Sequence, residues 1–484
     1  MQLFHRKNGE EQPYWSAGPF KIRLPFVHYR WEFAEMAQAL IMFVVTLAMI
    51  PLLETYLGIP YDVALAYVVI CGIGFMLPAL LGVPLVPGWI TPGIPVVLLF
   101  LSDYEPGPEA IQAMFALQFL VFIIFLILGV TRLGSKLVEF IPRSMKGGII
   151  IGAGIAALMG EIEAGGRLAA TPISLIVGGL VCLYLMFSVS FKGFVETNSI
   201  ARKIANYGMV PGMIVAILVG FATGEYAVPE VKWGITAPAF GELWNYLPFS
   251  VGFPEPSVFL YAIPTAVIAY IIAFGDIIVG QSLMNRVDHL RRDEDIDNSI
   301  DRVHLVTAIR NGGHAFFAPY PGLAGPIWTA VTATMAERYK YGRSAMDSIY
   351  SGGGTFWITG FIAIFILPLV SFFQPVLPIA LSLTLLLTGY ICLMVGLEQL
   401  ENNTERGIAG TMGVVLAVYG AGWGLATGAV LYFLIERTKL LGFTPDPDSP
   451  GADDVIIKPD AASQSAASQS AASQSAEPSQ AAAA

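Results

Sequence analysis

Long apolar runs recur along the whole chain and constrain its fold more than any other feature. Runs of about 20 residues, enough to cross a hydrocarbon core about 30 Å thick, follow one another from residue 34 to residue 435. Only 13% of the 484 residues are charged, about half the usual share in soluble domains. The sequence therefore predicts an all-α polytopic membrane protein, with the lipid bilayer as its main partner and no nucleic acid.

Hydropathy and loop composition predict fourteen transmembrane segments, seven on each side of a long polar stretch. The expected segments are 34–57, 63–81, 84–101, 109–130, 144–159, 173–191 and 207–222, then 257–284, 303–317, 319–336, 345–370, 375–397, 407–420 and 423–435. The expected domains are an N-terminal segment (1–33), a first repeat (34–222), an external loop (223–256), a second repeat (257–437) and a disordered, low-complexity tail (438–484).

Basic residues predict the orientation of these segments. An even number of segments places both ends of the chain on one side of the membrane. With that side cytoplasmic, every lysine and arginine except Arg167, Lys232 and Arg310 lies in a cytoplasmic tail or loop. This pattern predicts a multi-pass protein of the inner cell membrane with both termini cytoplasmic. Residues 1–33 contain no cleavable signal peptide, so the first segment is expected to act as the insertion signal.

Two of the segments are broken by the same pattern of proline and glycine. "PGWITP" starts at Pro87 and "PGLAGP" starts at Pro321, so both read P-G-x-x-x-P. The sequence offset between them also maps the first and second segments onto the eighth and ninth. Because seven is odd, the second half must enter the membrane from the opposite side. The chain is therefore predicted to contain a 7+7 inverted repeat whose third and tenth segments are broken.

Each broken segment is expected to hold a short extended strand followed by a half-helix. Thr91 is a good N-cap before a proline, and the pair Gly325-Pro326 is a weaker version of that signal. Helices of ten or eleven residues span about 15–17 Å, or about half the bilayer core. Both would begin near the midplane, where the strands could pair and the helix N-termini could bind an anion or a polar ligand. The alternative is a pair of ordinary proline kinks without a ligand. The predicted binding residues are Thr91, Pro92, Gly93, Ile94, Gly325, Pro326, Ile327, Trp328 and Thr329.

Ionisable residues inside apolar segments are further candidates. Asp276 lies within "IAYIIAFGDIIVGQSL", and a carboxylate there is a functional hypothesis by default. It could bind a proton or the substrate, or it could be a structural partner of Arg310 or of a backbone group. Gly275 beside it and Gln281 five residues on are weaker candidates. Arg310 and His314 share a helix face and could act in ion coupling, or Arg310 could pair with an acid and His314 could be satisfied near the outer surface.

Aromatic and sulfur-containing residues add less to the prediction of the site. Trp89 and Trp328 flank the two breaks and could stack on a planar ligand or simply pack. Cys71, Cys182 and Cys392 lie far apart in apolar runs without metal-ligand spacing, so we expect small buried side chains and no metal site. Neither a nucleophile cluster nor a continuous polar stripe is visible. The sequence therefore predicts neither an enzyme nor a channel, and no cofactor beyond a coupling proton or sodium ion.

Three stretches resemble the superfamily that joins the nucleobase–ascorbate (xanthine/uracil) permeases to the SulP anion transporters. They are "EFIPRSMKGGIIIGAGI" from residue 139, "IAFGDIIVGQ" and "PYPGLAGPIWTAV". The resemblance covers roughly residues 30–440. It implies a core domain of segments one to four and eight to eleven, a gate domain of the others, and strands of segments three and ten that cross at the substrate site. It also implies an acidic substrate residue in the eighth segment, at Asp276 or one turn earlier at Ile272, and a homodimer.

The tenth segment departs from both branches of that superfamily. It lacks the acid or amide that nucleobase permeases often carry, since residues 326–328 are Pro, Ile and Trp, and no arginine precedes Thr329 as in many SulP proteins. The resemblance implies proton- or sodium-coupled symport of a small polar solute by alternating access. A nucleobase such as xanthine or uracil is the first expectation. A small anion such as sulfate, bicarbonate or a carboxylate is the alternative.

Overall fold

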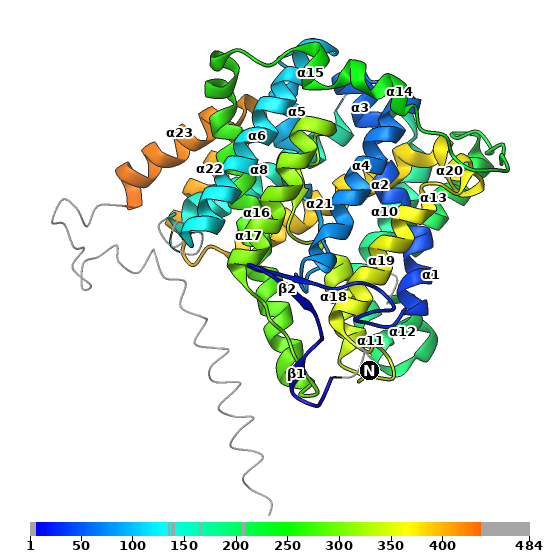
Figure 1. Ribbon diagram of the computed structural model, residues 1–484. Helices are drawn as coiled ribbons and strands as arrows, with labels where there is room; N and C mark the ends of the chain where they lie inside the picture. Colours follow the sequence, from blue (N-terminus) through cyan, green and yellow to red (C-terminus); the bar gives the residue numbers. More distant parts are fainter. Residues whose placement is uncertain (1–5, 134–135, 137–140, 164–165, 206–208, 437–484) are drawn as a thin grey trace, which may run out of the picture.

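The computed structural model describes residues 6–436, apart from residues 134–135, 137–140, 164–165 and 206–208 (Figure 1). In this part of the chain, six helices are long and apolar enough to cross a membrane by length and composition. A seventh results if the bent pair α10 (Pro172–Phe187) and α11 (Val189–Thr197) counts as one span. The multi-pass architecture is thus confirmed, while the count of fourteen and the inverted repeat stay predictions. The predicted disordered tail lies outside the described residues.

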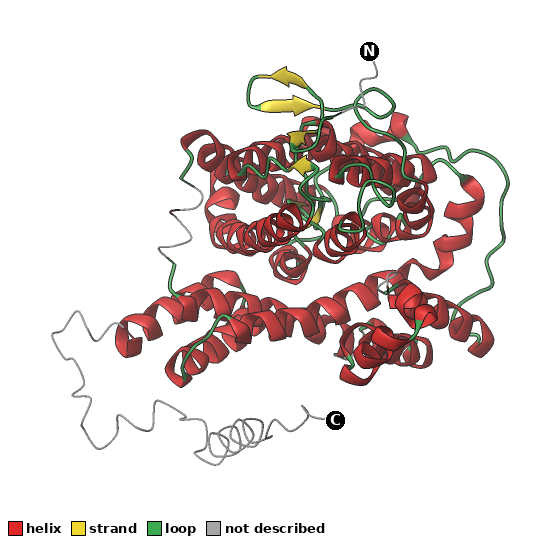
Figure 2. Ribbon diagram, turned by 90° about the horizontal axis from the view of Figure 1, so that it is seen from below, coloured by secondary structure: helices red, strands yellow, loops and turns green. Residues whose placement is uncertain are grey.

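The helices form two layers (Figure 2). In the larger layer, α17 packs on α4 and α6, α16 packs on α6 and α18, and α19 packs on α1 and α4. This layer encloses the short strands of the broken segments. Its helices are α1 (Phe33–Met42), α4 (Tyr61–Leu80), α6 (Pro108–Thr131), α16 (Pro256–Leu290), α17 (Ile300–Phe317), α18 (Thr329–Tyr339) and α19 (Ile349–Ala363).

The second layer is a flatter row of helices, in which α8 packs on α21 and α22, and α10 packs on α13 and α21. The short helix α5 (Ile94–Leu101) contacts α8 of this layer and α16 of the other. The grouping follows the core and gate division that the resemblance implies. The helices of the second layer are α8 (Arg143–Ile162), α10, α13 (Val210–Thr223), α21 (Leu377–Glu398), α22 (Asn403–Tyr419) and α23 (Ala421–Leu431).

Two of the later predicted segments are each divided into two helices. The segment predicted at 173–191 ends at Phe187 and bends by 59° into α11, because Ser188 is extended and caps the next helix through the N–H of Phe191. The segment predicted at 345–370 divides into α19 and α20 (Leu367–Phe373). Pro368 lies in the first turn of α20. Because proline has no backbone N–H, it cannot donate the hydrogen bond that would continue an earlier helix through this position.

Shorter elements connect these helices. The first segment consists of α1, α2 (Val44–Leu47) and α3 (Ile50–Leu57). The predicted external loop contains α14 (Phe240–Leu243), η2 (Trp244–Tyr246) and α15 (Pro248–Val251). The others are α9 (Arg167–Ala170), α12 (Ser199–Ala205), η3 (Gln374–Val376) and η4 (Tyr432–Glu436).

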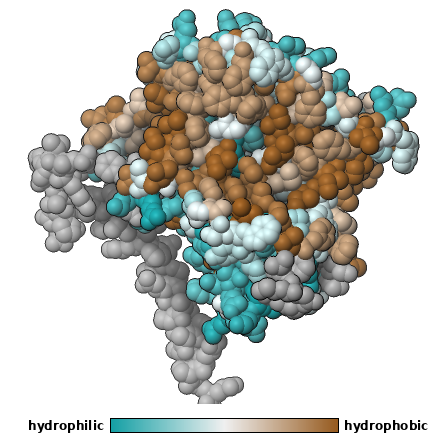
Figure 3. Space-filling model, in the orientation of Figure 1, coloured by the Kyte–Doolittle hydropathy of each residue, from teal (hydrophilic) through white to brown (hydrophobic). Residues whose placement is uncertain are grey.

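The surface divides as a bilayer requires. Apolar residues form a broad band across the middle of the molecule, and hydrophilic residues gather at its upper and lower ends (Figure 3). The N-terminal strands lie at that lower end (Figure 1). An exposed apolar band of this kind is stable only when lipid covers it.

Residues 6–32 form what we call the N-terminal strap, with strands β1 (Glu10–Glu11), β2 (Trp15–Ala17) and β3 (Phe20–Ile22). β1 pairs in parallel with β5 (Glu294–Asp295), which follows α16. The Arg6 side chain is fully buried and donates to the Asp293 carboxylate (2.8 Å) and to the Asp347 carbonyl (2.7 Å). The polar N-terminal segment is therefore part of the larger helix layer.

Arg6→Ala should destabilise the protein by about 3–5 kcal/mol, the usual effect of removing one partner from a buried ion pair. The reason is that Arg6 Nη2 lies 3.4 Å from the Glu294 carboxylate, and both side chains are fully buried. Thermal unfolding of the detergent-purified protein measures the effect. Lys7→Ala is the matched control, because Lys7 is 89% exposed and such a pair contributes at most about 1 kcal/mol. Equal stability of the two variants would contradict the role of Arg6.

At acidic pH, protonation of Asp297 should weaken the attachment of the N-terminal strap. Partial burial alone would raise the pKa of Asp297, but hydrogen bonds from Lys21 and Arg302 hold this pKa below its ordinary value of 3.8. The pKa of Asp297 is lower in the folded protein than in the unfolded chain. Its ionic contacts therefore stabilise the protein fully at a pH above the ordinary pKa, and this stabilisation is lost as the pH falls through the folded-state pKa. An acid-active protease should therefore cut the strap faster in that range. Asp297→Asn should be cut faster already at neutral pH, and an unchanged cutting rate would disprove the ionic contribution.

Candidate functional site

The two broken segments meet as an antiparallel strand pair. β4 (Gly88–Trp89) lies beside β6 (Ala324–Gly325), with Gly88 opposite Gly325 and Trp89 opposite Ala324. All four residues are buried. The predicted pairing of two short extended pieces is confirmed. A Cβ on Gly325 would lie 2.4 Å from the backbone C and O atoms of Trp89, so only glycine permits this close approach.

The first half-helix begins differently from the prediction. Residues Thr91–Gly93 form a 3₁₀ turn, η1, and α5 follows from Ile94. The prediction of Thr91 as a side-chain N-cap is wrong, because the N–H of Gly93 donates to the Ile90 carbonyl (2.8 Å) and the N–H of Ile94 to the Thr91 carbonyl. These backbone bonds of the tight turn use the donors that the Thr91 hydroxyl would need.

The second half-helix, α18, begins at Thr329 and not at Pro326 as predicted. Trp328 is still extended, and its N–H donates to the Val86 carbonyl at 2.6 Å. The N–H of Val86 donates in turn to the Thr332 hydroxyl at 3.2 Å. The backbone before α18 stays extended because it binds the other broken segment in place of its own helix.

Arg310 of α17 bonds to both strands at once. Its Nη1 donates to the Gly325 carbonyl (2.5 Å) and its Nη2 to the Gly88 carbonyl (3.0 Å), and the side chain is almost completely buried. The guanidinium lies 5.1 Å from the centre of the Phe75 ring, within the cation–π range. Among the described residues no carboxylate pairs with Arg310, so carbonyl groups take the place of the predicted acidic partner.

The sequence reasoning missed two amide side chains beside Arg310. Asn311 holds β6 by both backbone groups of Ala324, accepting from its N–H and donating to its carbonyl, each at 2.9 Å. Gln118 of α6 donates to Asn311 (3.3 Å) and accepts from the N–H of Tyr320 (3.1 Å). The available signal was the position of both amides inside apolar segments, where an unpaired amide is costly.

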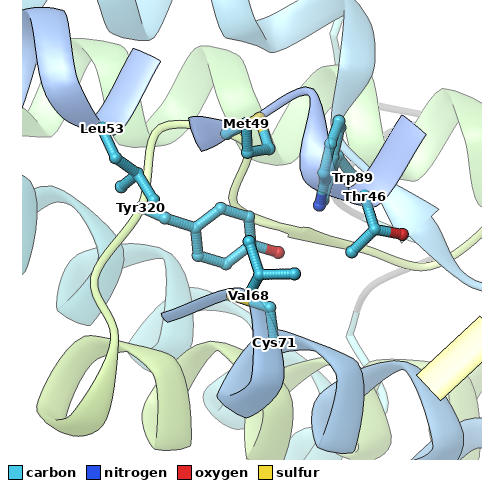
Figure 4. Close-up of a pocket in the computed structure, with 7 residues that line it drawn as sticks. All are labelled: Thr46, Met49, Leu53, Val68, Cys71, Trp89 and Tyr320. Carbon is cyan, nitrogen blue, oxygen red and sulfur yellow. The ribbon is translucent and has the colours of Figure 1, made fainter. Parts of the chain in front are cut away.

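His314 is buried one turn after Arg310. The alternative to an ion-coupling role had been a histidine satisfied near the outer surface. Neither of its ring nitrogens has a hydrogen-bond partner among the described residues. Its ring meets the Tyr320 ring edge-on at 5.1 Å. Tyr320 projects into a very small pocket in the larger layer (Figure 4). The residues that line this pocket are Thr46, Met49, Leu53, Val68, Cys71, Trp89 and Tyr320.

Asp276 lies on α16, which contacts both η1 and α18. A Cβ on Gly280, one turn later, would lie 2.9 Å from Ile327 Cδ1. Residues four apart share a helix face, so Asp276 is on the side of α16 that meets the second broken segment. Asp276 is partly exposed, and a Cβ on the neighbouring Gly275 would meet nothing within 4 Å. Among the described residues no hydrogen bond or ion pair engages Asp276.

The other predicted site residues divide by burial. Gln281 lies on the same helix but donates to the Asn298 carbonyl at 3.2 Å, in the connection to α17. Trp328 packs edge-on against Phe356 with ring centres 6.1 Å apart, and Trp89 lines the small pocket. The partly or fully exposed residues are Thr91, Pro92, Gly275, Asp276, Gln281, Trp328 and Thr329, and the buried ones are Trp89, Gly93, Ile94, Gly325, Pro326 and Ile327.

Several solved structures are similar to this chain. The overall structure of SLC26A9 is 14% identical, with 84% of this chain and 65% of that chain covered and a TM-score of 0.50. The transmembrane domain of a cyanobacterium bicarbonate transporter, BicA, is 15% identical (82% and 98% covered, TM-score 0.49). Murine Slc26a9, an anion transporter in the inward-facing state, is 13% identical (84% and 68% covered, TM-score 0.48). At such identities the likeness to SLC26A9 shows the fold alone.

A family model gives the stronger result. No curated protein matches the sequence, but the model of the permease family, named for xanthine and uracil permeases, matches residues 30–297. This match covers more than half of the chain and includes both the first broken segment and Asp276. It confirms the resemblance that the sequence motifs indicated. The chain therefore belongs to the permease family, and it is a membrane transporter and not an enzyme.

Proposed function

We propose that the chain is a secondary active transporter that moves a nucleobase such as xanthine or uracil by alternating access. The observation that carries this proposal is the strand pair, from which two half-helices begin in contact with α16. This helix carries Asp276, whose carboxylate has no partner among the described residues. The first backbone N–H groups of α18 are donors and a carboxylate is an acceptor. Together they complement the carbonyl and N–H groups along the edge of a planar nucleobase.

In this proposal five of the exposed members of the site bind the substrate, namely Asp276, Thr91, Pro92, Trp328 and Thr329. Asp276 also couples transport to a proton or sodium ion, and His314 is a second candidate because its ring nitrogens are unpaired among the described residues. The larger helix layer would carry the site past the second layer. Contacts of η1 and α5 with both layers support this proposal, because such a motion requires a site at the boundary between them.

A screen of the purified protein tests this proposal. We expect xanthine, uracil or a related base to raise the melting temperature and to be taken up by proteoliposomes, with uptake that depends on a proton or sodium gradient. Stabilisation is expected because a ligand that binds only the folded state shifts unfolding by mass action. If sulfate, bicarbonate or a carboxylate stabilises the protein and no base does, the nucleobase is the wrong substrate.

A small anion is the second candidate, and one observation favours it. Arg310 is a buried cation directly behind the strand pair, and among the described residues it has no carboxylate partner. Its positive charge adds to the partial positive charge of two helix N-termini. Uptake of labelled sulfate or bicarbonate in the same proteoliposomes separates this candidate from the first.

We also propose the orientation and assembly that the sequence favours. Both termini would be cytoplasmic in the inner membrane, and the transporter would be a homodimer. Single cysteines placed at Lys7 and Lys232 test the orientation, since only the second should react with an impermeant thiol reagent added outside the cell. The molar mass of the protein in detergent, measured by light scattering, tests the dimer.

A further inference from the structure

One guanidinium group joins the two halves of the chain at the strand pair. The two carbonyls that accept from Arg310 belong to Gly88 and Gly325, which lie directly opposite each other in the register. Nη1 and Nη2 each donate one of these bonds, at 2.5 and 3.0 Å. Each strand has only two residues, and such a short pair has little stability of its own.

The two strands depend on Arg310 to different degrees. β6 has additional support, because Asn311 binds both backbone groups of Ala324 and is itself held by Gln118. For β4, Arg310 is the only side chain among the described residues that donates a hydrogen bond to either of its two residues. Loss of Arg310 should therefore loosen both strands, whereas loss of Asn311 should loosen β6 alone.

We propose that Arg310 is a positioning residue that clamps β4 to β6 and so sets the distance between the starts of the two half-helices. This inference rests on the proposed function, in which those starts flank the substrate. The clamp needs the planar fork of arginine, since two carbonyls on separate strands must be reached by two nitrogens at fixed spacing. Phe75 packs against the guanidinium and holds its plane. Lysine keeps the charge but supplies only one nitrogen.

Hydrogen exchange of the substrate-free protein tests the clamp without any knowledge of the substrate. Arg310→Met should raise amide exchange in peptides covering residues 86–94 and in those covering 320–330. Asn311→Ala, the matched control one residue away, should raise exchange only in 320–330. Arg310→Lys is expected to give the same two-sided pattern, and it carries the test if Arg310→Met does not accumulate. Unchanged exchange at 86–94 in the arginine variants would overturn the proposal.

Transport kinetics then separate positioning from folding. With a substrate found in the screen, Arg310→Lys should raise KM about 10- to 100-fold with a smaller change in the maximal rate, because misplacement of binding groups by about 1 Å has effects of this size. A loss of folded protein alone would lower the maximal rate and leave KM unchanged. Wild-type KM in Arg310→Lys would overturn the clamp. If the wild-type protein transports nothing in the screen, the proposed function fails, while the exchange pattern still decides the clamp.

Discussion

Gly325→Ala is expected to lower transport by about 100-fold or more, the loss that follows when binding groups shift by about 1 Å. The added Cβ would lie 2.4 Å from the backbone C and O of Trp89 and 2.7 Å from the N of Ile90. Backbone atoms of a paired strand have no rotamer with which to avoid the contact. The strands must therefore move apart, and the two carbonyls that share Arg310 move with them.

Gly313→Ala is the matched control for that substitution. Gly313 lies on α17, and an added Cβ would meet nothing within 4 Å. Alanine also favours a helix over glycine by about 1 kcal/mol, so this variant should be at least as stable as the wild type and fully active. Uptake in proteoliposomes and thermal unfolding measure both properties. Wild-type uptake by Gly325→Ala would show that the strand spacing does not matter for transport.

Asp276→Asn is expected to lower uptake roughly 10- to 150-fold, because a hydrogen bond to a charged group is worth about 1.5–3 kcal/mol. Asparagine has almost the same shape as aspartate, so the packing of α16 should not change. Among the described residues Asp276 forms no ion pair that the substitution would break. Stability in detergent should therefore stay close to that of the wild type while uptake falls.

The pH dependence of the same variant tests ion coupling. If Asp276 carries the coupling proton, the fall of wild-type uptake with rising external pH should disappear in Asp276→Asn. Asp301→Asn is the control, since Asp301 makes a solvent-exposed pair with Arg132, and such pairs contribute little. Full uptake with an unchanged pH profile in Asp276→Asn would remove this residue from the site and from the coupling step.

Local sequence signals predicted the parts of the site that depend on residues close together in the sequence. Proline and glycine in "PGWITP" and "PGLAGP" indicated the breaks, the extended strands and their pairing. The predicted starts of the half-helices were wrong, because Thr91–Gly93 form a 3₁₀ turn and Trp328 stays extended before α18. At Trp328 the competing partner is the Val86 carbonyl, which is distant in sequence. Local propensity is overruled wherever such a tertiary bond is available.

Long-range polar contacts account for the other differences between the sequence predictions and the structure. The sequence singled out Arg310 as an ionisable residue inside a span, but its two carbonyl partners come from opposite halves of the chain. The strap was predicted only as a polar segment, because the carboxylates that bind Arg6 follow it by nearly 300 residues. Periodicity and composition report which face of an element is buried. They do not report which distant group a buried charge will meet.

The N-terminal strap has a consequence for the order in which the protein folds during synthesis. Arg6 is made first, yet its partners near Asp293 and Asp347 are made only after most of the chain. At about 5–20 residues per second, the strap waits tens of seconds on the ribosome without its binding groups. The larger helix layer can close only when α19 has been synthesised, so the first residues of the chain are among the last to reach their final place.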